Sequence, residues 1–212
     1  MTKIEDIIKI FTPQLTELGL ITKPRKRLWL DDNGLFVIVV DFQPLYNEGF
    51  LLNVGVKFMW YDPKYISYDY EYEYSRILIP HSPIQEVLFY NSPTFDRDIE
   101  YMKEKLNEKI EILRQMKDSD ILYDRLLNRK SSLNPTLAAV NLGVAAMLSG
   151  KENIALNIFN EFAAQSEIAA ECLCNCENSE TFKKYICARA NRVRNEFSSI
   201  HKYPLPEIII EQ

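Results

Sequence analysis

The chain contains few of the residues that catalytic and cofactor sites most often use. It has two histidines among 212 residues, and these, His81 and His201, lie far apart and accompany no recognisable nucleophile motif. It has six glycines, and none of them belongs to a phosphate-cradling loop or a dinucleotide fingerprint. We therefore expect a non-catalytic protein without a cofactor.

Long apolar runs and an excess of positive charge are also missing. No apolar run approaches the roughly 20 residues that cross a bilayer, and the first residues lack a signal-peptide core, so we expect a cytoplasmic protein that enters no membrane. The 30 acidic residues outnumber the 25 lysines and arginines, which gives a formal net charge of −5. Nucleic acids and anionic membranes repel such a protein, whereas a basic protein partner is favoured.

Cysteine is confined to one stretch of the chain. The four cysteines, Cys172, Cys174, Cys176 and Cys187, all lie in the last quarter, and a disulfide framework is not clustered in this way, so we expect reduced thiols. Thiolates also bind zinc, but only Cys172 and Cys176 would share one face of a helix, and the usual Cys-x-x-Cys pair is absent. We prefer buried thiols among alanines and predict no metal site.

The first half of the chain predicts a helix followed by an antiparallel sheet. Apolar residues at helical spacing indicate a helix over residues 3–18. Asn33-Gly34 supplies the positive φ angles of a tight hairpin turn, and alternating apolar residues follow Gly49. We predict a meander of four strands at residues 25–30, 35–42, 50–60 and 66–76.

The second half predicts helices. An apolar stripe indicates a long helix that begins at Ser92-Pro93 and covers the sheet. Further helices are expected at residues 121–127, 136–148, 152–164 and 181–197. The fold class is therefore α+β, with a sheet domain over residues 1–118 and an all-helical C-terminal region over residues 119–212 that packs on it.

Two features of the helical region suggest how it packs. Gly143, Ala155 and Phe159 fall at the spacing of a tetratricopeptide helix pair, in which a small glycine lets two helices approach closely; an ordinary helical hairpin explains the spacing as well, and we prefer it. The closing Tyr203-Pro204-Leu205-Pro206 predicts an extended tail, which either docks on the body of the protein or leaves an apolar end exposed.

The segment from Tyr68 to Tyr74 alternates tyrosine with carboxylate. Laid out as a strand, it places four tyrosines on one face and Asp69, Glu71 and Glu73 on the other. The acids either pair across the sheet in a solvated ladder or dock a cationic protein. The tyrosines either cover the core or line a ligand groove. The candidate groove residues are Tyr68, Tyr70, Tyr72 and Arg76.

Several segments of the first half, taken in order, resemble a known family. They are Leu15-Thr16-Glu17-Leu18-Gly19-Leu20, a strand ending in Trp29, Gly49-Phe50-Leu51-Leu52-Asn53-Val54-Gly55-Val56 and Tyr65-Ile66-Ser67-Tyr68-Asp69-Tyr70. Over about residues 3–118 this order resembles the bacterial domain of unknown function 4304 family. The resemblance implies a cytoplasmic α+β domain in bacteria with no established reaction, and it brings no catalytic residues.

Three functions fit these observations. The leading hypothesis is a non-catalytic protein-binding module, for example an immunity-type or antitoxin-like protein that docks a basic effector on Asp69, Glu71 and Glu73. The alternative is an enzyme or small-ligand binder with a pocket between the tyrosine-rich sheet and the C-terminal helices. The third is an adaptor whose helical hairpin forms a groove, which requires Leu142 and Phe159 to be partly exposed.

Overall fold

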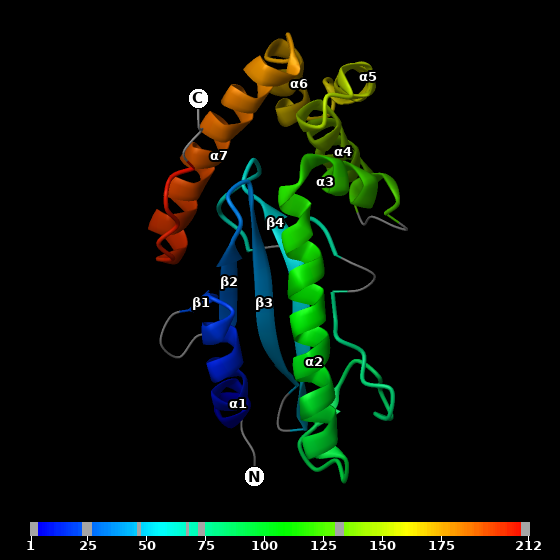
Figure 1. The fold of residues 1–212 in the computed structure, drawn as a ribbon, viewed down its shortest axis with the longest axis vertical. Coiled ribbons are helices and arrows are strands. Elements are labelled where there is room, and N and C mark those ends of the chain that lie inside the picture. Colours follow the sequence, from blue (N-terminus) through cyan, green and yellow to red (C-terminus); the bar gives the residue numbers. More distant parts are fainter. Residues whose placement is uncertain are drawn as a thin grey trace. The chain divides into compact units, whose positions relative to one another are not determined.

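The computed structural model describes residues 4–22, 27–45, 48–66, 68–71, 75–129 and 134–208. The chain divides into two compact units, shown in Figure 1. The sheet unit comprises Met1–Lys57 and Ile66–Arg114, and the helical unit comprises Phe58–Tyr65 and Gln115–Gln212. The predicted boundary at residue 118 lies close to the one at Arg114, but the membership of residues 58–65 in the helical unit was not predicted.

The sheet unit contains one antiparallel sheet in the order β1-β2-β3-β4-β5. Its strands are β1 (Ile21–Thr22), β2 (Leu28–Asp32), β3 (Phe36–Leu45), β4 (Gly49–Phe58) and β5 (Leu88–Phe89). The predicted hairpin joins β2 to β3: Gly34 has a φ of 77°, and the Asn33 amide donates to the Phe36 carbonyl over 3.0 Å. The α+β class, with an N-terminal helix, an antiparallel sheet and a helical C-terminal part, is confirmed.

The predicted fourth strand at residues 66–76 is not a continuous strand in its described residues, which leave out residues 67 and 72–74. The described part of this segment meets β4 only at two bridges, Val56 with Tyr70 and Asn53 with Arg76. The two bridges are six positions apart along this segment but only three positions apart along β4, whereas a regular ladder pairs residues one for one. Short separate segments pair with the edge of β4 instead. One of them is β5, which pairs with the first two residues of β4.

Helices α1 (Ile4–Glu17) and α2 (Phe95–Arg114) lie on one face of this sheet, and both contact β3 (Figure 1). The apolar stripe of α1 is buried, and the Phe11 ring packs edge-on against Phe42 of β3 with 5.2 Å between centroids. The stripe of α2 is likewise buried, at Ile99, Met102, Leu106, Ile110 and Leu113. The prediction that a long helix covers the sheet is therefore confirmed.

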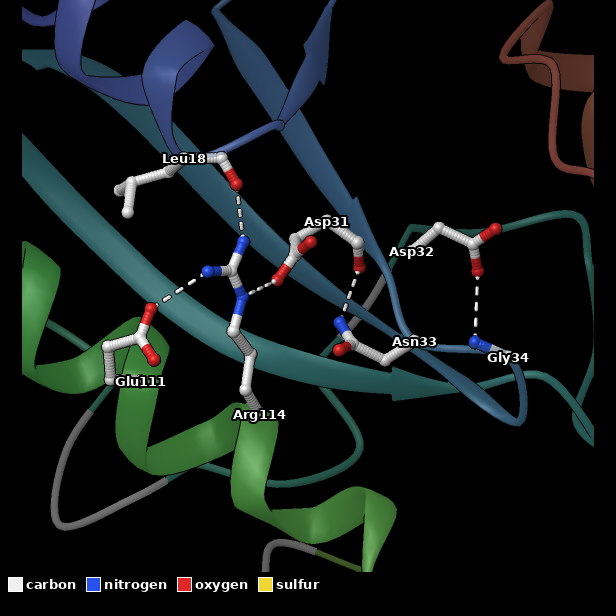
Figure 2. A network of polar contacts seen from close by, with 7 residues as sticks. All are labelled: Leu18, Asp31, Asp32, Asn33, Gly34, Glu111 and Arg114. Atoms are coloured by element: carbon white, nitrogen blue, oxygen red, sulfur yellow. Dashed lines mark hydrogen bonds and ion pairs between the residues drawn. The ribbon is translucent and has the colours of Figure 1, made fainter.

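Arg114, the last residue of α2, ties α1, β2 and α2 together (Figure 2). Its guanidinium donates to Asp31 of β2 over 2.7 Å, to Glu111 one turn earlier over 2.8 Å, and to the backbone carbonyl of Leu18, just after α1. Asp31 is buried, and its ion pair with Arg114 satisfies a carboxylate that would otherwise be desolvated without a partner.

The helical unit is built from a short 3-10 turn and five helices, all of which belong to the described part of the chain. They are η1 (Gln115–Lys117), α3 (Ser119–Leu127), α4 (Pro135–Leu148), α5 (Glu152–Phe162), α6 (Glu167–Cys174) and α7 (Ser179–His201). Helix α4 packs against both α3 and α5. The predicted close contact is confirmed, because a Cβ added at Gly143 would lie 2.6 Å from the Phe159 ring. No helix in the described ranges is long and apolar enough to span a bilayer.

The segment Phe58–Tyr65 contributes an aromatic pair to the core of the helical unit. Phe58 and Trp60 are fully buried and stack with 4.4 Å between ring centroids. The Trp60 indole donates to the side-chain oxygen of Asn141 over 3.0 Å, and its backbone carbonyl accepts from Arg189 over 2.9 Å. Residues from two distant parts of the chain therefore build this core.

Candidate functional site

The predicted acidic strip does not form a row of exposed carboxylates. Asp69 is only 4% exposed, so its proposed role in an open docking surface is wrong. The backbone explains the burial, because the Asp69 amide donates to the Val56 carbonyl over 2.7 Å and holds the residue against the edge of β4. Glu71 is half-buried, and Glu73 lies outside the described residues.

The residues of the predicted tyrosine groove are spread along β4. Tyr68 lies against Gly55, where an added Cβ would come within 2.4 Å of its ring, and Tyr70 is buried beside Val56. Arg76 pairs with Glu86 and bridges to Asn53, three residues or about 10 Å along β4 from the Tyr70 bridge. Tyr72 lies outside the described residues.

Tyr68 belongs instead to a polar cluster on the face of the sheet that α1 and α2 leave uncovered. Asp41 of β3 and Asn53 and Lys57 of β4 occupy alternate positions of this face, and Lys57 is only 1% exposed. Burial raises the pKa of Asp41, against the lowering effects of an Asn53 hydrogen bond and the charge of Arg27. Burial, then the charges of Asp41 and Glu71, raise the pKa of Tyr68. The cluster therefore offers a protonatable carboxyl beside a neutral phenol.

Sequence reasoning placed Lys57 among the polar positions of its strand but missed Asp41. The signal in the sequence was a carboxylate within the apolar run Phe36–Phe42. Asp41 alternates with Val37 and Val39, so it lies with them on the face of the sheet opposite α1 and α2.

The C-terminal tail forms a second polar arrangement, on α7. After α7 ends, residues 203–208 run back along it in an extended conformation. Asn191, Arg194 and Ser198 lie three and four residues apart and therefore share one face of the helix. All three hydrogen-bond to the tail, so of the two alternatives, a docked tail and an exposed apolar end, the described residues show the docked one.

The contacts to the tail are made to its backbone. The Asn191 amide forms a pair of hydrogen bonds with Ile208, accepting from its N–H over 2.8 Å and donating to its carbonyl over 3.1 Å. Arg194 donates through Nε and Nη2 to the Pro206 carbonyl, over 3.0 and 2.6 Å. Ser198 Oγ accepts from the Leu205 N–H over 3.1 Å. Three side chains of one helix face thus hold an extended backbone.

An open groove continues beyond this contact. It has a volume of about 660 Å³ and is lined by residues of α7 and of the tail, namely Ala188, Asn191, Arg192, Asn195, Glu196, Glu207 and Ile208. Sequence reasoning missed Asn191 and Arg194, since side chains that bind a backbone leave no motif beyond their helical spacing.

The cysteines are free thiols, and three of the four are buried. Burial raises the pKa of Cys172 to about 12, so this thiol stays protonated at neutral pH. Cys176 Sγ donates to the Leu173 carbonyl over 2.9 Å. Among the residues that the structure describes, no group of histidine, cysteine and carboxylate side chains is placed to hold a metal ion.

The two histidines lie in different units, and His201 contacts a backbone carbonyl. Its ring Nε2 lies 2.8 Å from the Pro63 carbonyl, which holds residues 58–65 to the end of α7. His81 is exposed.

Comparison with known proteins gives no relative for either unit. No family model matches the chain, and no curated protein or solved structure matches it. The candidate sites therefore have to be interpreted from their own geometry.

Proposed function

We propose that this chain is a protein-binding module whose helical unit holds an extended segment of a partner along α7. The proposal is carried by one observation: Asn191, Arg194 and Ser198 already bind an extended backbone there. An extended segment without internal hydrogen bonds presents free N–H and C=O groups, and side chains at fixed spacing on a rigid helix satisfy them. Recognition of this kind needs no reaction chemistry.

The properties of the whole chain support a basic partner in the cytoplasm. A net charge of −5 favours encounter with a cationic protein, and four free thiols suit a reducing compartment. An immunity-type or antitoxin-like role toward a basic effector is the most specific form of the proposal. In this proposal the contact lies on α7 and not on the predicted acidic strip, whose first residue, Asp69, is buried. Membership of the domain of unknown function 4304 family remains part of the same proposal.

Capture of partners on the purified full-length protein tests the proposal. We expect Asn191→Ala to reduce the amount of a stoichiometric partner at moderate salt, because it removes both hydrogen bonds to the backbone at Ile208. Asn160→Ala is the matched control, since Asn160 is exposed on α5 and bonds only within its own helix at Leu156. Equal capture by the wild type and both variants would exclude the α7 face as the binding site.

A small-molecule site is the second candidate, and the polar cluster around Asp41 favours it. A carboxyl of raised pKa beside the phenol of Tyr68 can hydrogen-bond a polar ligand. The test is a metabolite screen by thermal shift on the wild type and Asp41→Asn. A ligand that stabilises only the wild type, in proportion to its concentration, would establish this site.

A further inference from the structure

We infer that the α7 face selects extended segments of the pattern aromatic-Pro-aliphatic-Pro, and that the chain's own tail occupies this face in competition with the partner. The inference rests on the proposed function. It adds which segments are recognised and what keeps the face closed in the absence of a partner.

Burial alternates along the tail. Tyr203 and Leu205 are 3% and 7% exposed, whereas Pro204, Pro206 and Glu207 are exposed. In an extended segment, alternate side chains point to the same side. The protein therefore buries an aromatic and an aliphatic side chain two residues apart. These two positions determine which segment sequences the face accepts.

The two prolines of the tail, Pro204 and Pro206, lie where no backbone N–H is needed. The hydrogen bonds to the tail use the N–H of Leu205, the carbonyl of Pro206 and both backbone groups of Ile208. None of them requires an N–H at position 204 or 206, where proline has none. Proline also fixes φ in the extended range, which lowers the entropy lost when a segment binds. Proline is therefore compatible with the two exposed positions, 204 and 206, that follow the two buried side chains.

A single residue, Lys202, joins α7 to the tail. Lys202 has a φ of 61° and is, within the described ranges, the one non-glycine residue with a positive φ. It caps the helix by donating its N–H to the Ser198 carbonyl over 2.9 Å and reverses the chain direction. A segment tethered by one residue has a high effective concentration, so a free competitor meets an already occupied site.

A labelled peptide tests the inference on the full-length chain. The probe is a fluorescein-labelled heptapeptide with the sequence of residues 202–208, Lys-Tyr-Pro-Leu-Pro-Glu-Ile. The variant Tyr203→Ser/Leu205→Ser removes the two buried side chains of the tail and leaves the sequence of α7 unchanged. We expect saturable binding to this variant, at least about tenfold tighter than to the wild type, by fluorescence anisotropy.

Two controls assign the binding to the α7 face and to the pattern. Adding Asn191→Ala to the tail variant should weaken the peptide by about tenfold, because two hydrogen bonds are lost. A peptide with serine in place of its tyrosine and leucine should not bind. Circular dichroism of each variant confirms that α7 remains folded.

The outcomes separate this inference from the proposed function. Failure of the peptide to bind a folded tail variant overturns the inference, and so does binding that Asn191→Ala leaves unchanged. If the full-length protein fails this peptide test but still captures a partner, and Asn191→Ala abolishes that capture, the proposed function holds without the inference. Light scattering could also show that the wild type is a dimer and that the peptide dissociates it. The segment bound on α7 would then be the tail of a second copy, which overturns the inference that a partner's segment binds there.

Discussion

At the scale of single residues, Arg114 makes several stabilising polar contacts at once. Its guanidinium reaches three acceptors on three parts of the sheet unit (Figure 2). Lysine keeps the charge but has no planar fork, so it satisfies fewer of them. We expect Arg114→Lys to lower the free energy of unfolding by about 1–3 kcal/mol, measured by urea denaturation.

Lys184→Ala is the control for this prediction. Lys184 pairs with Glu180 on α7, but both side chains are largely exposed, and such pairs contribute little. Its effect should stay within about 0.5 kcal/mol. If both variants lost a similar free energy of unfolding, the contacts of Arg114 would contribute no more to stability than an exposed surface ion pair does.

At the scale of secondary-structure elements, the contact between α4 and α5 depends on the missing side chain of Gly143. In a free helix, alanine is more favourable than glycine by about 1 kcal/mol. Here the added methyl group would lie 2.6 Å from the Phe159 ring and 3.1 Å from Ile158. We expect Gly143→Ala to destabilise the protein by about 1–3 kcal/mol despite the better propensity, as measured by thermal or urea unfolding.

Phe159→Leu in the same chain distinguishes the clash from other causes. The double variant should recover part of the stability lost in Gly143→Ala, since the smaller side chain gives the methyl group room. If Gly143→Ala stabilises the chain instead, α4 and α5 do not approach as closely in solution.

Element periodicity predicted much of this fold, and its failures have physical causes. The apolar stripes of α1 and α2 and the Asn33-Gly34 turn are local signals, and they gave the right elements. The alternation at Tyr68–Tyr74 indicated a strand equally well, but pairing depends on the partner strand, and the bridges to β4 lie at unequal spacing. The short α6 and the two-residue strands β1 and β5 carry too few residues for a periodic signal.

The candidate sites were less predictable than the fold for the same reason. Asn191 and Arg194 act on the backbone of residues 206–208, so their role depends on where the tail runs and not on a motif. The acidic strip was visible in the sequence, yet the hydrogen bond from the Asp69 amide to Val56 buries its first member. Side-chain spacing predicts a shared face but not the surface that covers it.

At the scale of the whole molecule, the helical unit depends on eight residues from the first third of the chain, 58–65. Trp60 is fully buried there and hydrogen-bonds to Asn141. We expect Trp60→Ala to lower the stability of the helical unit by about 3–5 kcal/mol, measured by the loss of helical circular dichroism in urea. The buried side-chain oxygen of Asn141 would also lose the indole N–H that it accepts from.

Tyr65→Ala is the control within the same segment, because Tyr65 is 70% exposed. It should change the stability by less than about 0.5 kcal/mol. An equal loss in both variants would show that residues 58–65 act as a connection alone, without a side chain that the helical core needs.

The excursion of residues 58–65 also sets a delay during protein synthesis. Trp60 hydrogen-bonds to Asn141, 81 residues later, and to Arg189, 129 residues later. At a synthesis rate of about 5–20 residues per second, the last of these partners is made roughly 6–26 s after Trp60. Throughout that interval the stacked pair of Phe58 and Trp60 lacks the part of its core that α7 supplies. The newborn chain therefore presents a short, strongly apolar segment that a chaperone can hold until the ribosome has delivered α7.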